Sequence, residues 1–182
     1  MIMSFATWLE NLDFFTYIRG SGNEYPAILA LHLVGMALFG GMILLTDLRL
    51  LGWILPDQSI ASIVNATRWP KRIGFLWVAT CGFILASSKA EGYLLNAFFQ
   101  LKLTLFALVF VHAMVFRGSV YNHPEELDKT PQPPGRAKLA GAISLVLWLG
   151  IMCAGRGIGY LNAPPGLHYA AWLRTILKLV TG

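Results

Sequence analysis

Four long apolar stretches constrain the fold of this chain more than any other feature of its sequence. They cover about residues 26–45, 73–90, 97–116 and 139–159, and a helix needs about 20 apolar residues to cross a hydrocarbon core of about 30 Å. Only 13% of the residues are charged, whereas soluble domains carry about 25%. The pattern predicts an all-α fold, a four-helix transmembrane bundle that forms one integral membrane domain over residues 1–182.

The segments at the two ends of the chain have the spacing of amphipathic helices. Residues 1–19 contain two acids and lack the basic start of a signal peptide. Residues 166–180 also repeat apolar residues at helical spacing. We expect both segments to lie in the membrane interface. The apolar face of the first consists of Phe5, Trp8, Leu9, Leu12 and Phe15.

The distribution of basic residues predicts the orientation. The first and third connections between the spans carry eight Lys and Arg residues, and the opposite side carries six. Because cytoplasmic loops are enriched in Lys and Arg, we predict a bacterial inner-membrane protein with both termini in the periplasm. The third connection contains Pro-Gln-Pro-Pro-Gly at 131–135, which predicts a polar loop. The net charge of +5 includes no run of five basic residues, which argues against nucleic acid as a partner.

Several common site motifs are absent from the sequence. Cys81 and Cys153 each lie in an apolar run, and no CxxC, CxxCH or zinc-type Cys/His spacing occurs. Neither a P-loop nor a GxGxxG motif follows a strand-like segment, since the glycines at 155–159 end an apolar helix. The sequence therefore gives no support to a nucleotide site or a covalently attached haem.

The polar groups inside the spans are the candidate functional residues, because ionisable side chains in a membrane are costly. At about 1.5 Å per residue, His32, Lys102 and Arg156 lie roughly 9, 8 and 5 Å below the outer surface. His112 lies roughly 22 Å down the third span by the same measure. One imidazole and two cations from three different spans therefore share one level.

A b-type haem would supply the anions that this level lacks. The iron takes an imidazole, for which His32 is the candidate ligand, and the two propionates would pair with Lys102 and Arg156. Small residues such as Gly35 would leave room for the ring. His112 is the second candidate ligand, and Met152 is an alternative to it. Asp47, at the inner end, is expected to pair with a basic side chain: Arg49, Arg68 or Arg72.

Each of these signals has a simpler interpretation. Small residues at i, i+4 spacing usually allow close packing of helices. Lys102 and Arg156 could extend their charged ends to lipid head groups. His32 could be a packed histidine that is bonded to a backbone carbonyl.

Two segments resemble known membrane families. Ala30–Gly52 (ALHLVGMALFGGMILLTDLRLLG) and Phe98–His112 (FFQLKLTLFALVFVH) resemble the first and third helices of HemJ-type protoporphyrinogen oxidases and of CopD-like proteins. The segments DLRLLG at 47–52 and AGR at 154–156 resemble an uncharacterised bacterial four-helix family. The HemJ-type resemblance implies a b-haem oxidoreductase in which His32 and Lys102 take the functional positions.

Three functions remain open at this point. The first is a redox protein with one haem b, which exchanges electrons with a quinone or a periplasmic partner. The second is a CopD-like protein that handles a metal. The third is a non-catalytic subunit that packs against a larger membrane complex. In all three the lipid bilayer is the immediate partner.

Overall fold

The computed structural model describes residues 2–130 and 132–160, and every regular element in these ranges is helical. The all-α prediction is therefore confirmed for this part of the chain, whereas the predicted helix at 166–180 lies outside it. The helices are α1 (Ile2–Glu10), α2 (Asp13–Gly20), α3 (Glu24–Leu51), α4 (Ile60–Ser87), α5 (Ala90–Leu95), α6 (Ala97–Phe116) and α7 (Gly135–Tyr160), with a π-helical turn η1 (Arg117–Tyr121) and a 3-10 helix η2 (Pro124–Lys129).

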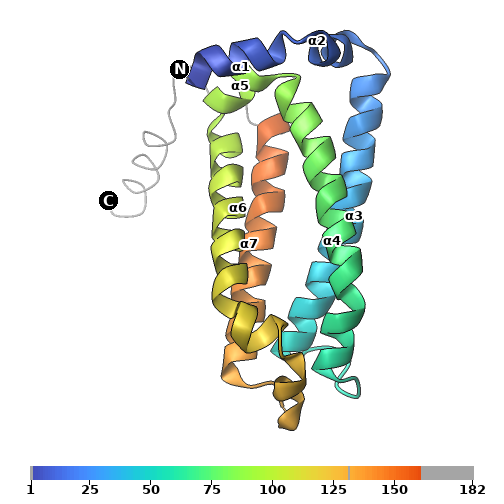
Figure 1. The fold of residues 1–182 in the computed structure, drawn as a ribbon, viewed down its shortest axis with the longest axis vertical. Coiled ribbons are helices and arrows are strands. Elements are labelled where there is room, and N and C mark those ends of the chain that lie inside the picture. Colours follow the sequence, from blue (N-terminus) through green and yellow to red (C-terminus); the bar gives the residue numbers. More distant parts are fainter. Residues whose placement is uncertain (1, 131, 161–182) are drawn as a thin grey trace, which may run out of the picture.

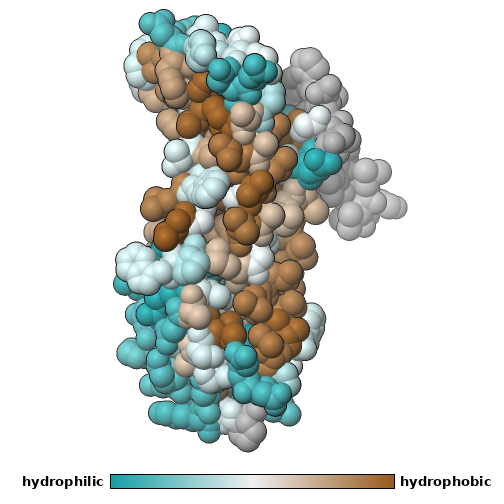
Figure 2. Space-filling view, turned by 90° about the vertical axis from the view of Figure 1, so that its right-hand side faces the viewer, coloured by the Kyte–Doolittle hydropathy of each residue, from teal (hydrophilic) through white to brown (hydrophobic). Residues whose placement is uncertain are grey.

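The four long helices α3, α4, α6 and α7 lie side by side as a bundle (Figure 1). Helix α3 packs against α4 and α7, and α6 packs against α7. Three helical segments are long and apolar enough to cross a membrane, namely Glu24–Leu51, Ala97–Tyr121 and Gly135–Gly159. Apolar side chains cover the middle of the molecule, and hydrophilic ones gather toward its two ends (Figure 2). The chain is thus a helical membrane protein.

Helix α4 is as long as α3 but is not among these three segments. It starts at Ile60, well before the predicted span at 73–90, and its first half carries Arg68, Lys71 and Arg72. After Arg72 the uncharged part of the helix is residues 73–87, and these 15 residues are fewer than the about 20 that cross a membrane core. Pro70 also lies inside α4, where it removes one backbone hydrogen bond.

The helix ends follow from local capping groups. The Ser59 side chain accepts a hydrogen bond from the Ser62 amide at the start of α4. The Asn96 side chain accepts two backbone amide bonds at the start of α6. Gly52 ends α3 with a φ of +79°, a left-handed conformation that favours glycine.

The first 20 residues form two helices across one end of the bundle instead of one continuous helix (Figure 1). The chain breaks between α1 and α2, after Glu10. Arg19 turns back to pair with the Glu10 carboxylate at 2.5 Å. The apolar face predicted for this segment is partly on the surface, since Phe5 is 59% and Trp8 56% exposed.

This leader is attached to the connection between α4 and α6. The Glu91 amide donates to Glu10 Oε2 at 2.9 Å, and the Thr7 hydroxyl donates to Glu91 Oε1. Arg19 also donates to the carbonyl oxygen of Ser88 at 3.4 Å. We call this end of the molecule, with α1, α2 and α5, the outer end.

The connection between α6 and α7 forms a folded cap on the other, inner end, and residues 132–134 of its Pro-rich segment have no regular structure. Val120 of η1 and Leu127 of η2 are fully buried. Asp128 accepts hydrogen bonds from the backbone amides of Ile60 and Ala61, at 2.7 and 2.9 Å, and so caps α4 from a distant part of the chain. The buried cluster at this end consists of Leu50, Ile60, Val64, Val120, Leu127, Ala137 and Ala140.

Two glycines allow α3 and α7 to approach closely. A Cβ atom at Gly141 would lie 2.8 Å from the Asp47 carbonyl oxygen, and one at Gly40 would lie 2.6 Å from Trp148 Nε1. Both positions therefore require glycine for the packing. By contrast, nothing lies within 4 Å of a Cβ atom at Gly41.

Candidate functional site

His32 lies inside the bundle in its outer half. It is 9% exposed, and its ring lies against α4, where a Cβ atom at Gly82 would be 3.1 Å from its Cε1. The buried Nδ1 atom has no hydrogen-bond partner within the described residues. Because buried polar groups are nearly always satisfied, the Nδ1 atom is the candidate position for a ligand, whereas the Val78 backbone also interacts with the ring.

Lys102 of α6 belongs to the same part of the bundle. Its Nζ would be 3.6 Å from a Cβ atom at Gly155 of α7, and its positive charge acts on the His32 ring. The ammonium lies 6.0 Å from the Phe106 ring centroid. Within residues 2–130 and 132–160 it forms no hydrogen bond or ion pair. The Lys102 charge thus acts on the His32 ring, and its ammonium has no anionic partner in the described ranges.

The other residues predicted for this level have different surroundings. The Arg156 side chain is exposed on α7. Met152, one turn earlier, is 44% exposed and faces outward. Gly35 faces α4, where a Cβ atom would lie 3.0 Å from Trp77 Cδ1 and 3.1 Å from Val78 Cγ2. The space beside Gly35 is therefore occupied by protein.

His112 lies in the inner half of the bundle, on α6. Its Nε2 is 3.0 Å from the Ala140 carbonyl oxygen, and its ring contacts Phe116 and Tyr121. It lies beside Asp47 of α3, which is about four turns along that helix from His32. The structure does not bring the two histidines to one site.

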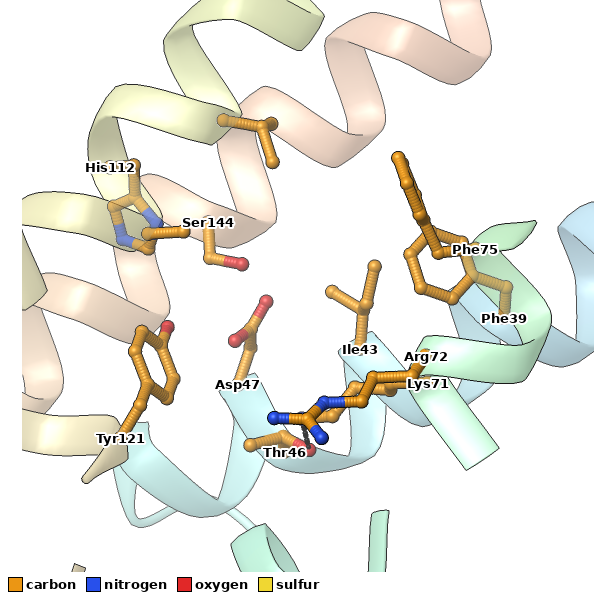
Figure 3. Close-up of a pocket in the computed structure, with 12 residues that line it drawn as sticks. Phe39, Ile43, Thr46, Asp47, Lys71, Arg72, Phe75, His112, Tyr121 and Ser144 are labelled. Atoms are coloured by element: carbon orange, nitrogen blue, oxygen red, sulfur yellow. Dashed lines mark hydrogen bonds between the residues drawn. The ribbon is translucent and has the colours of Figure 1, made fainter. Parts of the chain in front are cut away.

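A cavity of about 290 Å³ occupies this inner half (Figure 3). Aromatic and aliphatic side chains form one part of its wall, and several polar side chains form another part. The lining residues are Phe39, Ile43, Thr46, Asp47, Lys71, Arg72, Phe75, Val109, His112, Ala113, Tyr121 and Ser144.

Asp47 is the central polar group of this cavity. Its side chain points into the cavity, toward Ser144 (Figure 3). The residue is only 2% exposed, and its Oδ2 atom has no hydrogen-bond partner among the described residues. A buried carboxylate oxygen without a partner is rare and so requires an explanation.

The predicted pairing of Asp47 with a nearby arginine is wrong. Arg49 donates to the Gln58 carbonyl oxygen at 2.8 Å, and Arg68 donates to the Tyr121 carbonyl oxygen at 2.8 Å. Arg72 extends over the Trp69 ring at 5.1 Å. None of these three guanidinium groups is therefore the ion-pair partner of the Asp47 carboxylate in the described ranges.

Lys71 supplies the positive charge of the cavity. Its Nζ donates to Thr46 Oγ1 at 3.1 Å, and its charge acts on Asp47. The Thr46 hydroxyl is also 3.1 Å from that of Thr67. Arg72 also lines the cavity, and its guanidinium is exposed at the Trp69 ring. Asp47 and Lys71 therefore offset each other inside the cavity without forming an ion pair among the described residues.

One known protein family is similar to this chain over most of its length. A model described as a family of unknown function (DUF6644) matches residues 5–161. The chain belongs to this DUF6644 family. The matched range includes all seven α-helices in whole or in part and both polar regions described above. No curated protein and no solved structure matches the chain.

Most of the inner cavity of this DUF6644 protein could not be recognised from the sequence. Lys71 lies in the predicted cytoplasmic connection, Ser144 lies in an apolar span, and Tyr121 belongs to no motif. One usable signal was Asp47, an acid two residues beyond the apolar stretch at 26–45. No three His, Cys, Asp or Glu side chains come together within the described ranges, so the metal-handling alternative gains no support there.

Proposed function

We propose that this DUF6644 protein is a membrane-embedded b-type haem protein with a redox role. His32 would bind the iron, and Lys102 would bind a propionate. The observation that carries the proposal is the buried Nδ1 atom of His32, which has no hydrogen-bond partner among the described residues and lies within the field of the Lys102 ammonium. These two side chains supply the imidazole and the cation that a haem needs.

The haem and the residues of the chain would have different roles in the proposed redox function. When bound, the haem would supply a one-electron redox centre. The chain would orient the imidazole by packing it against Gly82, and it would hold the propionate with a Lys102 side chain that has no competing ion pair in the described ranges. The surrounding apolar helices would exclude water. Exposed Arg156 would pair with the second propionate only if that group reaches the surface of α7.

We also propose that α4 crosses the membrane with the three apolar helices, so that the bundle has four spans. Its 28 residues give a length of about 42 Å, which exceeds a hydrocarbon core of about 30 Å. Its basic residues lie in its inner half, where they can reach the head groups. The inner end would face the bacterial cytoplasm, because Lys and Arg are enriched there.

The visible spectrum of the purified chain, expressed with haem available, tests the haem. We expect a Soret band that His32→Ala abolishes while the protein still inserts and purifies. His123→Ala is the matched control, because His123 is exposed in the cap at the inner end. His112→Ala should retain most of the haem, since its imidazole is already bonded to Ala140. A colourless wild-type protein would refute the proposal and favour the packing-subunit alternative.

A further inference from the structure

We propose that the inner cavity binds the head group of a lipid-soluble quinol, with Asp47 accepting a hydrogen bond from a quinol hydroxyl. The Oδ2 atom of Asp47 has no hydrogen-bond partner among the described residues, the side chain points into the cavity (Figure 3), and the residue is only 2% exposed. Apolar walls with a few convergent polar groups are typical of sites for small molecules. The cavity at the base of α3 has this composition.

The charges of the cavity indicate a neutral ligand. The described lining residues with a full charge are Asp47, Lys71 and Arg72, and the Arg72 guanidinium lies over the exposed Trp69 ring. Inside the cavity an anion would face the Asp47 carboxylate, and a cation would face the Lys71 ammonium, so either would meet a like charge in a medium of low dielectric constant. A quinol is neutral and carries two hydroxyl groups on opposite sides of one ring. One hydroxyl can donate to the Asp47 carboxylate, with which the Ser144 side chain also interacts.

The position of the cavity indicates a ligand that arrives through the membrane. Helices α4 and α6 are not among the closely packed helix pairs of the described chain, and both contribute to the lining. Phe75 of α4 is 50% exposed, and Ala113 of α6 is exposed as well. The cavity therefore opens sideways between these helices toward the lipid chains. A quinol tail could extend outward there while the ring stays inside.

The size of the cavity suits a single substituted ring. Its volume of about 290 Å³ is at the lower limit of ligand pockets, which is about 300 Å³. Phe39 and Phe75 lie on the side of the cavity opposite His112 and Tyr121 (Figure 3), where a flat ring can pack against their aromatic rings. The aromatic side chains of the cavity thus match the flat ring of a quinol head group, and its polar side chains match the hydroxyl groups.

A role of this site in electron transfer rests on the proposed function as a haem protein, whereas the binding of a quinol does not. If the haem is present, the quinol is its electron partner from within the membrane. If the haem is absent, the cavity still has the same walls, acid and opening. The two proposals can therefore fail separately, because His32→Ala protein without haem should still bind the quinol.

The test is calorimetric titration of the full chain in detergent with a reduced short-chain ubiquinone analogue, decylubiquinol. We expect one site per chain and, in Asp47→Asn, an affinity about tenfold or more lower, because a hydrogen bond to a charged acceptor is lost. Asp57→Asn is the control, since Asp57 is exposed in the α3–α4 connection. Absence of binding, or equal affinity in Asp47→Asn and wild type, would overturn the proposal.

A second pair of variants applies if Asp47→Asn fails to fold. Ala113→Trp fills the opening of the cavity and should abolish binding. Ala107→Trp, on an exposed part of the same helix outside the cavity lining, should leave it unchanged. Decylbenzene, which lacks the two oxygens, should bind far more weakly than decylubiquinol. Equal binding of both compounds would show a lipid slot without polar recognition and would overturn the proposal.

Discussion

The close contact between α3 and α7 can be tested by adding one methyl group. In Gly141→Ala the new Cβ atom would lie 2.8 Å from the Asp47 carbonyl oxygen and 3.1 Å from Leu50 Cβ. The first neighbour is backbone, which cannot rotate away, so the two helices must separate by several tenths of an ångström. Overpacking of this kind costs about 1–3 kcal/mol.

The matched control is Gly41→Ala, where nothing lies within 4 Å of the new methyl group. Both substitutions replace a glycine in a helix interior and gain about 1 kcal/mol of helix propensity. This gain cancels in the comparison, so we expect Gly141→Ala to be less stable than Gly41→Ala by about 1–3 kcal/mol. Unfolding of the full chain in mixed micelles, followed by far-UV circular dichroism, measures the difference. Equal stability of the two variants would refute the close approach of α3 and α7.

Three further predictions concern other parts of the molecule. Lys102→Met should speed the transfer of haem to apomyoglobin, because a charge-assisted bond of about 1.5–3 kcal/mol is lost; unchanged haem retention would argue against its role. A cysteine at Gln132 should react with impermeant reagents from the cytoplasmic side only, and labelling from the periplasm would reverse the proposed orientation. Asp128→Ala should lower the free energy of unfolding by about 1 kcal/mol, since it caps the Ile60 and Ala61 amides, whereas Asp57→Ala should have little effect.

The helical class of the chain could be predicted because hydrophobic length reports directly on membrane helices. The ends of the helices could not be predicted from the sequence, because each predicted span ends where its run of apolar residues ends. Helix α4 continues through Arg68 and Lys71 because tertiary contacts at the inner end support it. The Asp128 carboxylate fixes its first turn from nearly 70 residues away in the sequence, and no local pattern reveals such a cap.

The two polar regions show a similar contrast. His32 and Lys102 could be related from the sequence because depth along straight spans is simple arithmetic. The surroundings of Asp47 depend on the rotation of each helix about its axis, which depth does not provide. Its arginine neighbours in the sequence therefore suggested an ion pair, whereas the structure turns Lys71 and Ser144 toward it and turns Arg49 away.

The attachment of the leader has a consequence for the order of assembly. Glu10 and Arg19 leave the ribosome long before Ser88 and Glu91, the residues whose backbone they bind. The contacts of α1 and α2 with these residues therefore cannot form until α3 and α4 have been synthesised and α5 has emerged. Docking of the leader thus marks the completion of the first helical hairpin.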